Sequence, residues 1–180
     1  MTDIISDIQP AAGAAEGSHA PIRSPLEGSE EGLNFDLIEL LFFAYRDFTS
    51  DPDAILERQG FGRAHHRVVH FVNRMPGLTV AELLDVLKIT KQSLARVLKQ
   101  LIETGHVVQI PGPKDRRQRE LYPTAKGRAL ALALARPQSR RISKALEETG
   151  ADNRAAVEEF LRAMVEKELR PQYDRLPKGR

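Results

Sequence analysis

Apolar residues recur at helical spacing through most of the chain after residue 33. Residues 37–48 are apolar around most of a helical circumference, which predicts a helix that is buried on more than one side. A second helix is predicted over residues 63–74. Two more are predicted, one beginning after Thr79 and one running from Thr90 to Gly105, because threonine is a favoured N-cap and glycine often follows a helix end.

Two short strand-like runs, HVVQI and RELYP, follow these helices. The stretch between them, PGPKDRRQR from Pro111 to Arg119, has a glycine between two prolines and then five charges in six residues. Pro, Gly and charged residues are typical of a polar hairpin tip. The pattern therefore predicts a β-hairpin with a basic tip, which is either a solvated turn or a surface that grips an anion.

The rest of the chain is predicted to be helical. Helical spacing continues from Thr124 to Glu148, and Pro137 is expected to kink or divide this helix. A last amphipathic helix is predicted from Asp152 to about Leu169. The predicted fold class is thus mainly α with a small β-hairpin wing.

The formal net charge of +2 conceals an uneven distribution. Residues 1–33 hold six acidic side chains and one basic one among many Ala, Gly, Ser and Pro residues, which predicts a disordered acidic tail. Residues 88–128, in contrast, hold ten Lys or Arg against three acids. A charge run is most often a solvated face, but a basic excess this concentrated favours a polyanionic partner.

The helix that begins after Thr90 has two unlike faces. Its apolar residues share one stripe at i, i+3, i+4 and i+7, namely Leu94, Val97, Leu98 and Leu101. The polar side chains on the opposite side or at the helix start are Thr90, Lys91, Gln92, Ser93, Arg96 and Lys99. Arg and Lys suit guanine edges and phosphates, Gln suits adenine, and a helix N-terminus suits a phosphate. The same pattern also fits an ordinary amphipathic helix with a solvated face.

The predicted hairpin favours the DNA interpretation of that helix. A helix fits the major groove of DNA, and a hairpin beside it can reach the flanking minor groove. The charged side chains of the hairpin tip are Lys114, Asp115, Arg116, Arg117 and Arg119. Asp115 is expected to pair with Arg117 and to hold that guanidinium in one rotamer, because a preorganised Arg loses less on binding.

Two joined motifs cover the predicted helices and hairpin: GLTVAELLDVLKITKQSLARVLKQLIETGHV, and DRRQRELYPTAKG, which ends at Gly127. Together they resemble the MarR family of winged helix-turn-helix regulators, whose wing carries Asp-x-Arg followed by Leu, Thr and Gly at set distances. LLFFAYRDF, GFGRAHHRVVHFVNR and ARPQ are most similar to the PetP-like subgroup. The chain departs from the family at Lys88, where a turn Gly is frequent, and at Pro123, which replaces Leu and removes a strand donor near the expected sheet edge.

The resemblance implies a homodimer that binds double-stranded DNA at a pseudo-palindromic promoter site and is modulated by a small ligand. It also implies four parts: residues 1–33 as the tail, 34–75 as N-terminal helices for dimerisation and effector binding, 76–127 as the winged helix-turn-helix DNA-binding region, and 128–180 as C-terminal dimerisation helices. The apolar first helix supports the dimer independently, because a helix that is apolar on most sides needs a partner.

Three histidines lie in the stretch RAHHRVVHF, and His66 and His70 share a helical face at i, i+4. Two imidazoles at this spacing can share a metal, and histidine can also ligate haem, so a metal- or haem-responsive sensor is the alternative function. The favoured interpretation is that they pack near the dimer core or an effector pocket, with Tyr45 and Arg46 as neighbours. No Cys and no HExxH motif completes a metal site, so no metal or cofactor is predicted.

Composition argues against several other classes of protein. The chain contains no Cys, so disulfides and thiol chemistry are impossible. It has no Gly-rich phosphate loop after a strand and no GxSxG motif, so no catalytic residues are predicted and an enzyme is not expected. The longest apolar run, LIELLFFAY, is shorter than the roughly 20 residues that cross a bilayer, and no secretory signal pattern begins the sequence. We expect a cytoplasmic protein.

Overall fold

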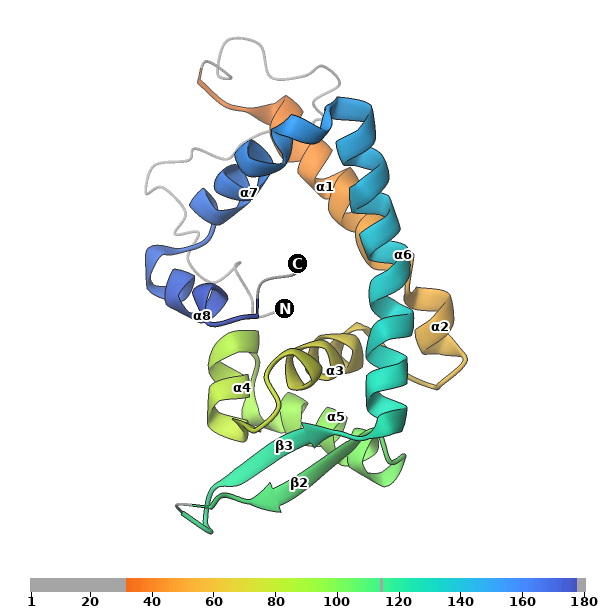
Figure 1. Cartoon of the computed structure of the whole chain (residues 1–180), viewed down its shortest axis with the longest axis vertical. Helices are drawn as coiled ribbons and strands as arrows, with labels where there is room; N and C mark the ends of the chain where they lie inside the picture. The colour runs from red at the N-terminus through yellow and green to blue at the C-terminus, as the bar shows by residue number, and fades with distance from the viewer. Residues whose placement is uncertain (1–31, 114, 178–180) are drawn as a thin grey trace, which may run out of the picture. The chain divides into compact units, whose positions relative to one another are not determined.

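The computed structural model describes residues 32–113 and 115–177, and Figure 1 shows their helices and strands. The elements in chain order are α1 Phe35–Ser50, α2 Asp53–Glu57, α3 Arg63–Arg74, β1 Leu78–Thr79, α4 Val80–Leu87, α5 Lys91–Glu103, β2 Val107–Pro111, β3 Arg119–Pro123, α6 Ala125–Thr149, η2 Ala151–Asn153, α7 Arg154–Ala163, η3 Lys167–Leu169 and α8 Arg170–Asp174. The predicted fold class, mainly α with a small β-hairpin, is confirmed. The expected acidic tail lies almost entirely outside the described residues.

Helix α1 contains the boundary between two compact units, which falls between Ala44 and Tyr45. No side chain of α1 is buried, and Phe42 and Leu40 are 70% and 62% exposed. A single chain therefore does not bury this helix, and the expectation that a partner covers it stays a prediction. Its apolar surface remains available to another molecule.

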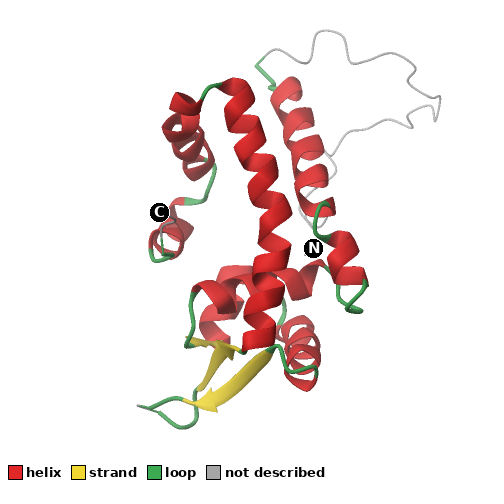
Figure 2. Ribbon diagram, turned by 45° about the vertical axis from the view of Figure 1, so that its right-hand side comes forward, coloured by secondary structure: helices red, strands yellow, loops and turns green. Residues whose placement is uncertain are grey.

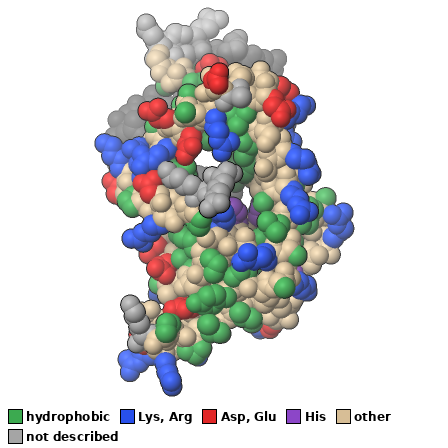
Figure 3. All heavy atoms as spheres, viewed as in Figure 1, with side chains coloured by type: hydrophobic (Ala, Val, Ile, Leu, Met, Phe, Trp, Pro, Cys, Tyr) green, Lys and Arg blue, Asp and Glu red, His purple; other side chains and the backbone are tan. Residues whose placement is uncertain are grey.

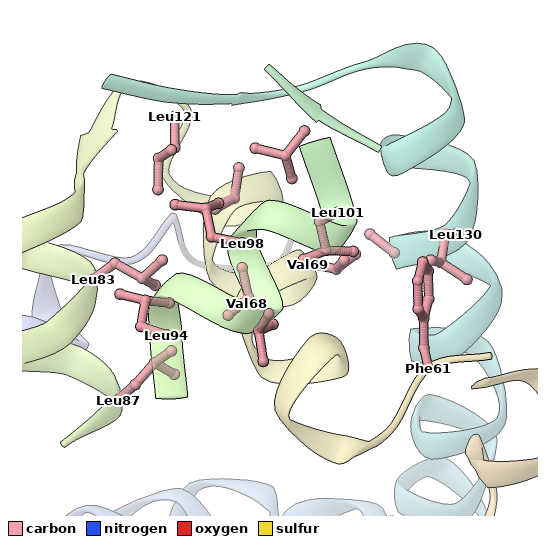
Figure 4. Packing of buried hydrophobic residues seen from close by; sticks show 14 of the residues in the cluster. Phe61, Val68, Val69, Leu83, Leu87, Leu94, Leu98, Leu101, Leu121 and Leu130 are labelled. Atoms are coloured by element: carbon pink, nitrogen blue, oxygen red, sulfur yellow. The ribbon is translucent and has the colours of Figure 1, made fainter. Parts of the chain in front are cut away.

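The core of the unit after Tyr45 lies where α3, α4 and α5 meet the sheet and the start of α6. Figure 4 shows Val68 and Val69 of α3, Leu83 and Leu87 of α4, and Leu94, Leu98 and Leu101 of α5 pointing into one cluster. The apolar stripe predicted for the helix after Thr90 is confirmed, since all four of its members are buried. The opposite face of α5 is consequently turned away from the core.

The structure confirms that threonines cap the starts of two predicted helices. Thr79 caps α4 in a capping box: its hydroxyl oxygen accepts from the Glu82 amide at 3.2 Å, and the Glu82 carboxylate accepts from the Thr79 amide at 2.9 Å. The hydrogen bond from the Thr79 hydroxyl is the main reason that the pKa of Glu82 lies below its ordinary value. Thr90 caps α5 by accepting from the Ser93 amide at 3.2 Å. Gly105 follows the end of α5 with φ of +73°, a conformation that favours glycine.

The sheet has three antiparallel strands in the order β1-β3-β2, so the hairpin of β2 and β3 gains a short third strand that the sequence did not reveal. Pro123 is the last residue of β3, opposite Val107. β3 is the central strand, but β1 pairs only with its Glu120 and Leu121, so Pro123 lies beyond the end of β1 as well as at the end of the β2–β3 ladder. This agrees with the expected place near a sheet edge, where the missing donor is tolerated.

Two further expectations need correction. Helix α6 runs unbroken through Pro137, so the proline does not divide it. Directly after the proline, the Gln138 amide donates to the Phe48 carbonyl at 3.2 Å and Arg141 pairs with Asp51 at 2.6 Å, and these contacts hold the helix in place. The last predicted helix is wrong in extent. It ends at Ala163, and the Arg170 guanidinium donates to the Ala163 carbonyl at 2.9 Å, which satisfies a helix-end acceptor.

Candidate nucleic-acid interface

Helix α5, which we call the reading helix, exposes one polar face. Lys91, Gln92, Ser93, Arg96 and Lys99 are all exposed, as the sequence predicted. Thr90 donates its hydroxyl proton to Ser93 Oγ at 2.9 Å, which leaves the Ser93 proton available to an outside acceptor such as a phosphate. Lys99 lies 3.7 Å from Glu103 in an exposed i, i+4 pair, and such a pair is weak enough to exchange for a stronger anion.

The wing, residues 107–123, is the hairpin of β2 and β3 and projects beyond the helices in Figure 2. The strands pair from Val107 and Pro123 out to Pro111 and Arg119. Beyond that pair the Gly112 amide donates to the Gln118 carbonyl at 2.9 Å, which continues the hairpin towards its tip. The side chains of Arg116, Arg117 and Arg119 are exposed. Lys114, the remaining predicted cation, lies outside the described residues.

Asp115 bonds the expected residue, Arg117, but through its backbone amide and not through its guanidinium. Its carboxylate accepts a hydrogen bond from the backbone amide of Arg117 at 2.9 Å, and no ion pair with the guanidinium is found among the described residues. This is the local bond by which Asp commonly shapes a turn. Asp115 therefore orders the backbone of the wing tip and leaves the Arg117 side chain to contact another group.

The reading helix and the wing share one groove. A cavity of about 560 Å³ lies between them, with a floor of aliphatic side chains that includes Leu84 and Ala95. Lys91 of α5 and Arg117 and Arg119 of the wing line the same cavity. Lys and Arg side chains also gather at the wing tip in the space-filling view of Figure 3. Basic residues of two separate elements thus line one groove, whereas Arg96 and Lys99 of α5 do not belong to its lining.

Gln109 of β2 also lines this groove, and the sequence reading missed it. The signal was present, because a strand has a period of two and Gln109 therefore shares a face with the buried Val107. Its amide is placed to contact whatever occupies the groove.

A second cavity, of about 670 Å³, lies among α3, α6, α7 and the residues around α8. Its lining includes His70 and Arg74 of α3 and Arg154 of α7, with aliphatic walls such as Ile142 and Leu161. Of the four residues predicted for an effector pocket, only His70 belongs to this lining; Tyr45, Arg46 and His66 do not. Arg46 forms an ion pair with Asp47 at 2.8 Å, and Tyr45 is 64% exposed.

Burial lowers the pKa of three histidines below its ordinary value. Burial is the main cause that lowers the pKa of both His66 and His70, and the neighbouring His70 and Arg74, respectively, lower these pKa values further. His106, which the sequence reading did not consider, is only 2% exposed, and burial lowers its pKa as well. Within residues 32–113 and 115–177, no three side chains of the metal-ligating types cluster together.

A helix pair joined by a tight turn, followed by a basic hairpin, defines a winged helix-turn-helix. The model of the MarR family matches residues 59–118. The HTH-type transcriptional regulator PetP of Rhodobacter capsulatus is 47% identical over 139 residues, which are 77% of this chain and 84% of that protein. The chain belongs to the MarR family and is a transcriptional regulator of that type, a class of protein that is not an enzyme.

Solved structures agree at the level of the fold. Streptococcus pneumoniae FabT in complex with DNA has a TM-score of 0.64 at 16% identity, covering 72% of this chain and 93% of that one. A MarR protein from Peptoclostridium difficile also has a TM-score of 0.64, at 20% identity, covering 87% of this chain and 97% of that one. In the part of the chain that the structure describes, no helix is both long and apolar enough to cross a membrane.

Proposed function

We propose that the protein binds double-stranded DNA with the reading helix in the major groove and the wing at the flanking minor groove. The observation that carries this proposal is the single groove lined by Lys91 of α5 and by Arg117 and Arg119 of the wing. A helix is the right width for a major groove, and Arg is favoured in a narrow minor groove by its negative potential. The FabT structure was solved with DNA, which supports the same use of the shared fold.

The exposed face of α5 provides both kinds of contact that DNA recognition needs. Gln92 and Arg96 carry planar groups that can bond a base edge through two atoms at once, Gln to adenine and Arg to guanine. Lys91, Ser93 and Lys99 instead suit phosphate oxygens, which fix register without reading sequence. In this proposal Arg116, Arg117 and Arg119 provide the flanking contacts from the wing.

We further propose that two copies of the chain act together on a pseudo-palindromic promoter site. The apolar side chains of α1 are exposed, and so are Val157, Phe160, Leu161 and Met164 on or just after α7. An exposed apolar surface of this kind marks an interaction site. A twofold dimer presents two reading helices about one turn of DNA apart and thereby matches two half-sites.

Modulation by a small ligand completes the proposal, and the cavity beside α3 supports it. Arg74 and Arg154 outweigh the one acid of the lining, Glu158, within largely aliphatic walls, an environment that suits a small organic anion. Because α3 packs against α5, a ligand that favours one position of α3 can favour one position of the reading helix. The ligand can shift DNA binding only by its difference in affinity for the two positions.

Replacing Arg96 with alanine tests the proposed role of the reading helix. If Arg96 bonds a base edge, Arg96→Ala should weaken binding to the preferred site by about 1–3 kcal/mol, and binding to random duplex should change little. The preferred site is first obtained by selection from a random-sequence duplex library with the wild-type protein. Affinities are then compared by fluorescence anisotropy, with Lys144→Ala on α6 as a control for the loss of one exposed cation.

Two outcomes would count against this role of Arg96. An equal loss on the preferred and random duplexes would make Arg96 a phosphate contact rather than a base reader. A loss no larger than that of Lys144→Ala would remove Arg96 from the interface.

A further inference from the structure

The reading helix carries two glutamines whose surroundings differ. Gln92 is exposed in the first turn, whereas Gln100 is half-buried near the other end. At 100° per residue, Gln100 lies about 40° around the helix from Arg96, so its position alone would suit another base-reading amide. Both polar atoms of the Gln100 side chain, however, are bonded within the protein.

Three hydrogen bonds link Gln100, His65 of α3 and the loop before α3. The Gln100 amide nitrogen donates to the Gly60 carbonyl at 3.2 Å, and its amide oxygen lies 2.8 Å from His65 Nε2. The Gly62 backbone amide donates to His65 Nδ1 at 3.1 Å. Since Nδ1 accepts, the proton of the neutral imidazole is on Nε2, which donates it to Gln100. The bonds thus form a closed circuit from Gly62 through His65 and Gln100 back to Gly60.

Phe61, which the circuit encloses, anchors the circuit to the hydrophobic core. Phe61, between the two glycines, is buried, and Figure 4 shows its ring extending towards Leu130 of α6. The ring stacks on His65 with centroids 4.8 Å apart and meets His106 edge-on at 5.1 Å. His106 immediately precedes β2, so the circuit joins the loop before α3, the reading helix and the base of the wing.

The apolar contacts of α5 with the core restrain the helix in a different way from the circuit. Leu94, Leu98 and Leu101 pack through dispersion and the hydrophobic effect, which depend on area rather than direction. A hydrogen bond requires both distance and alignment. The circuit therefore adds directional bonds to the loop before α3, separate from the bond that Lys126 donates to the Thr104 carbonyl just after α5 at 2.8 Å.

We propose that Gln100 is a positioning residue that, together with His65, sets the rotation of the reading helix about its own axis and so aims Gln92 and Arg96. This inference rests on the proposed DNA binding. A base contact through two atoms is sensitive to errors of about 10–20° in the group that carries it. Phosphate contacts by Lys are tolerant, because an ammonium acts as a point charge. Loss of the circuit should therefore reduce sequence discrimination much more than general affinity.

The test compares Gln100→Leu and His65→Asn in the full-length protein. Gln100→Leu keeps the size of the side chain and removes both of its bonds. His65→Asn retains an acceptor that can reach the Gly62 amide but is too short to reach Gln100. For each variant the affinity for a duplex selected by the wild-type protein is divided by the affinity for a random-sequence duplex.

We expect both variants to reduce this ratio by about tenfold, with binding to random duplex unchanged within about twofold. The double variant should be no worse than either single variant, because both changes break the same circuit. Gln92→Leu should cost less discrimination in the His65→Asn background than in the wild-type protein, because Gln92 is already misaimed once the circuit is broken.

Three other results of these binding measurements would contradict the assignment of Gln100, each for a different reason. If Gln100→Leu reduced the ratio and His65→Asn did not, Gln100 would itself read a base. If both variants lost specific and random binding equally, the circuit would support only the fold. If the wild-type protein bound no duplex, the proposed function would fail, and the assignment of Gln100 would fail with it.

Discussion

Gly127→Ala will lower the free energy of unfolding by about 3 kcal/mol, because a methyl group at this position has no room. A Cβ placed on Gly127 would lie 1.9 Å from the carbonyl oxygen of His106 and 2.9 Å from its carbonyl carbon. Both atoms belong to the backbone, so no side-chain rotation can relieve the contact. The loss is large beside the total stability of about 5–15 kcal/mol that is typical of a domain.

The same backbone is held in place by Thr124, the N-cap of α6. The Thr124 amide donates to the His106 carbonyl at 3.1 Å, and its hydroxyl oxygen accepts from the Gly127 amide at 3.0 Å. Moving α6 away from His106 would therefore break the start of the helix. Only glycine permits this approach.

Urea unfolding followed by circular dichroism measures the effect. Arg128→Ala is the matched control, since Arg128 is the exposed neighbour in the same helical turn and should change stability by no more than about 0.5 kcal/mol. If Gly127→Ala unfolded at the same urea concentration as Arg128→Ala, the close approach of α6 to His106 would be contradicted.

Replacing Arg116, Arg117 and Arg119 together with alanine should lower affinity for every duplex by roughly 10² to 10³ at 100 mM salt. The three side chains are exposed on the wing and none pairs with an acid among the described residues, so their charge is available to phosphates. Each lost phosphate contact should also reduce the slope of log affinity against log salt by about 0.9. Sequence preference should change less than affinity, because base edges are read mainly by α5.

A second triple variant, which removes three positive charges elsewhere, shows whether the loss of affinity depends on the position of the charges or only on the net charge. Arg67 of α3 and Arg140 and Lys144 of α6 are exposed and lie outside the proposed interface. Alanine at all three positions should weaken DNA binding by only about two- to fivefold, through long-range attraction. Equal losses in the two triple variants would mean that the wing is not the site of contact.

Local signals in the sequence determined most of the fold correctly. The prediction of helix 63–74 coincides with α3 because its apolar period is clear and glycines and a proline lie on either side. Thr79, Thr90 and Gly105 marked helix ends because their side chains or backbone satisfy groups that helix ends leave free. The buried stripe and the exposed face of α5 followed from the 3.6-residue period alone.

What the sequence did not reveal depends on partners distant along the chain. Gln100 looked like any polar residue of α5, since its bond to His65 spans 35 positions. The last predicted helix was too long because Arg170 folds back onto the carbonyl of Ala163, and periodicity carries no sign of such a contact. For Asp115 the partner residue, Arg117, was predicted correctly, but the prediction chose the guanidinium, whereas an Asp in a turn commonly bonds the backbone.

Lys88 shows how a departure from the family pattern can be accommodated. It has φ of +49° and ψ of +48° at the end of α4, the left-handed region in which the family often has glycine. A residue with a side chain pays a modest conformational cost there, on the order of 1 kcal/mol. The turn between α4 and α5 nevertheless forms, so the position requires the conformation and not glycine itself.

The central claim is that the reading helix and the wing form one surface that grips duplex DNA. Its most direct test is the affinity of the wild-type protein for a double-stranded fragment, measured by fluorescence anisotropy between 50 and 200 mM salt. If the two elements of a dimer neutralise about 6–10 phosphates, affinity should fall by roughly 10³ to 10⁵ over this range. Absence of measurable binding at 50 mM salt, or binding that does not depend on salt, would contradict the claim.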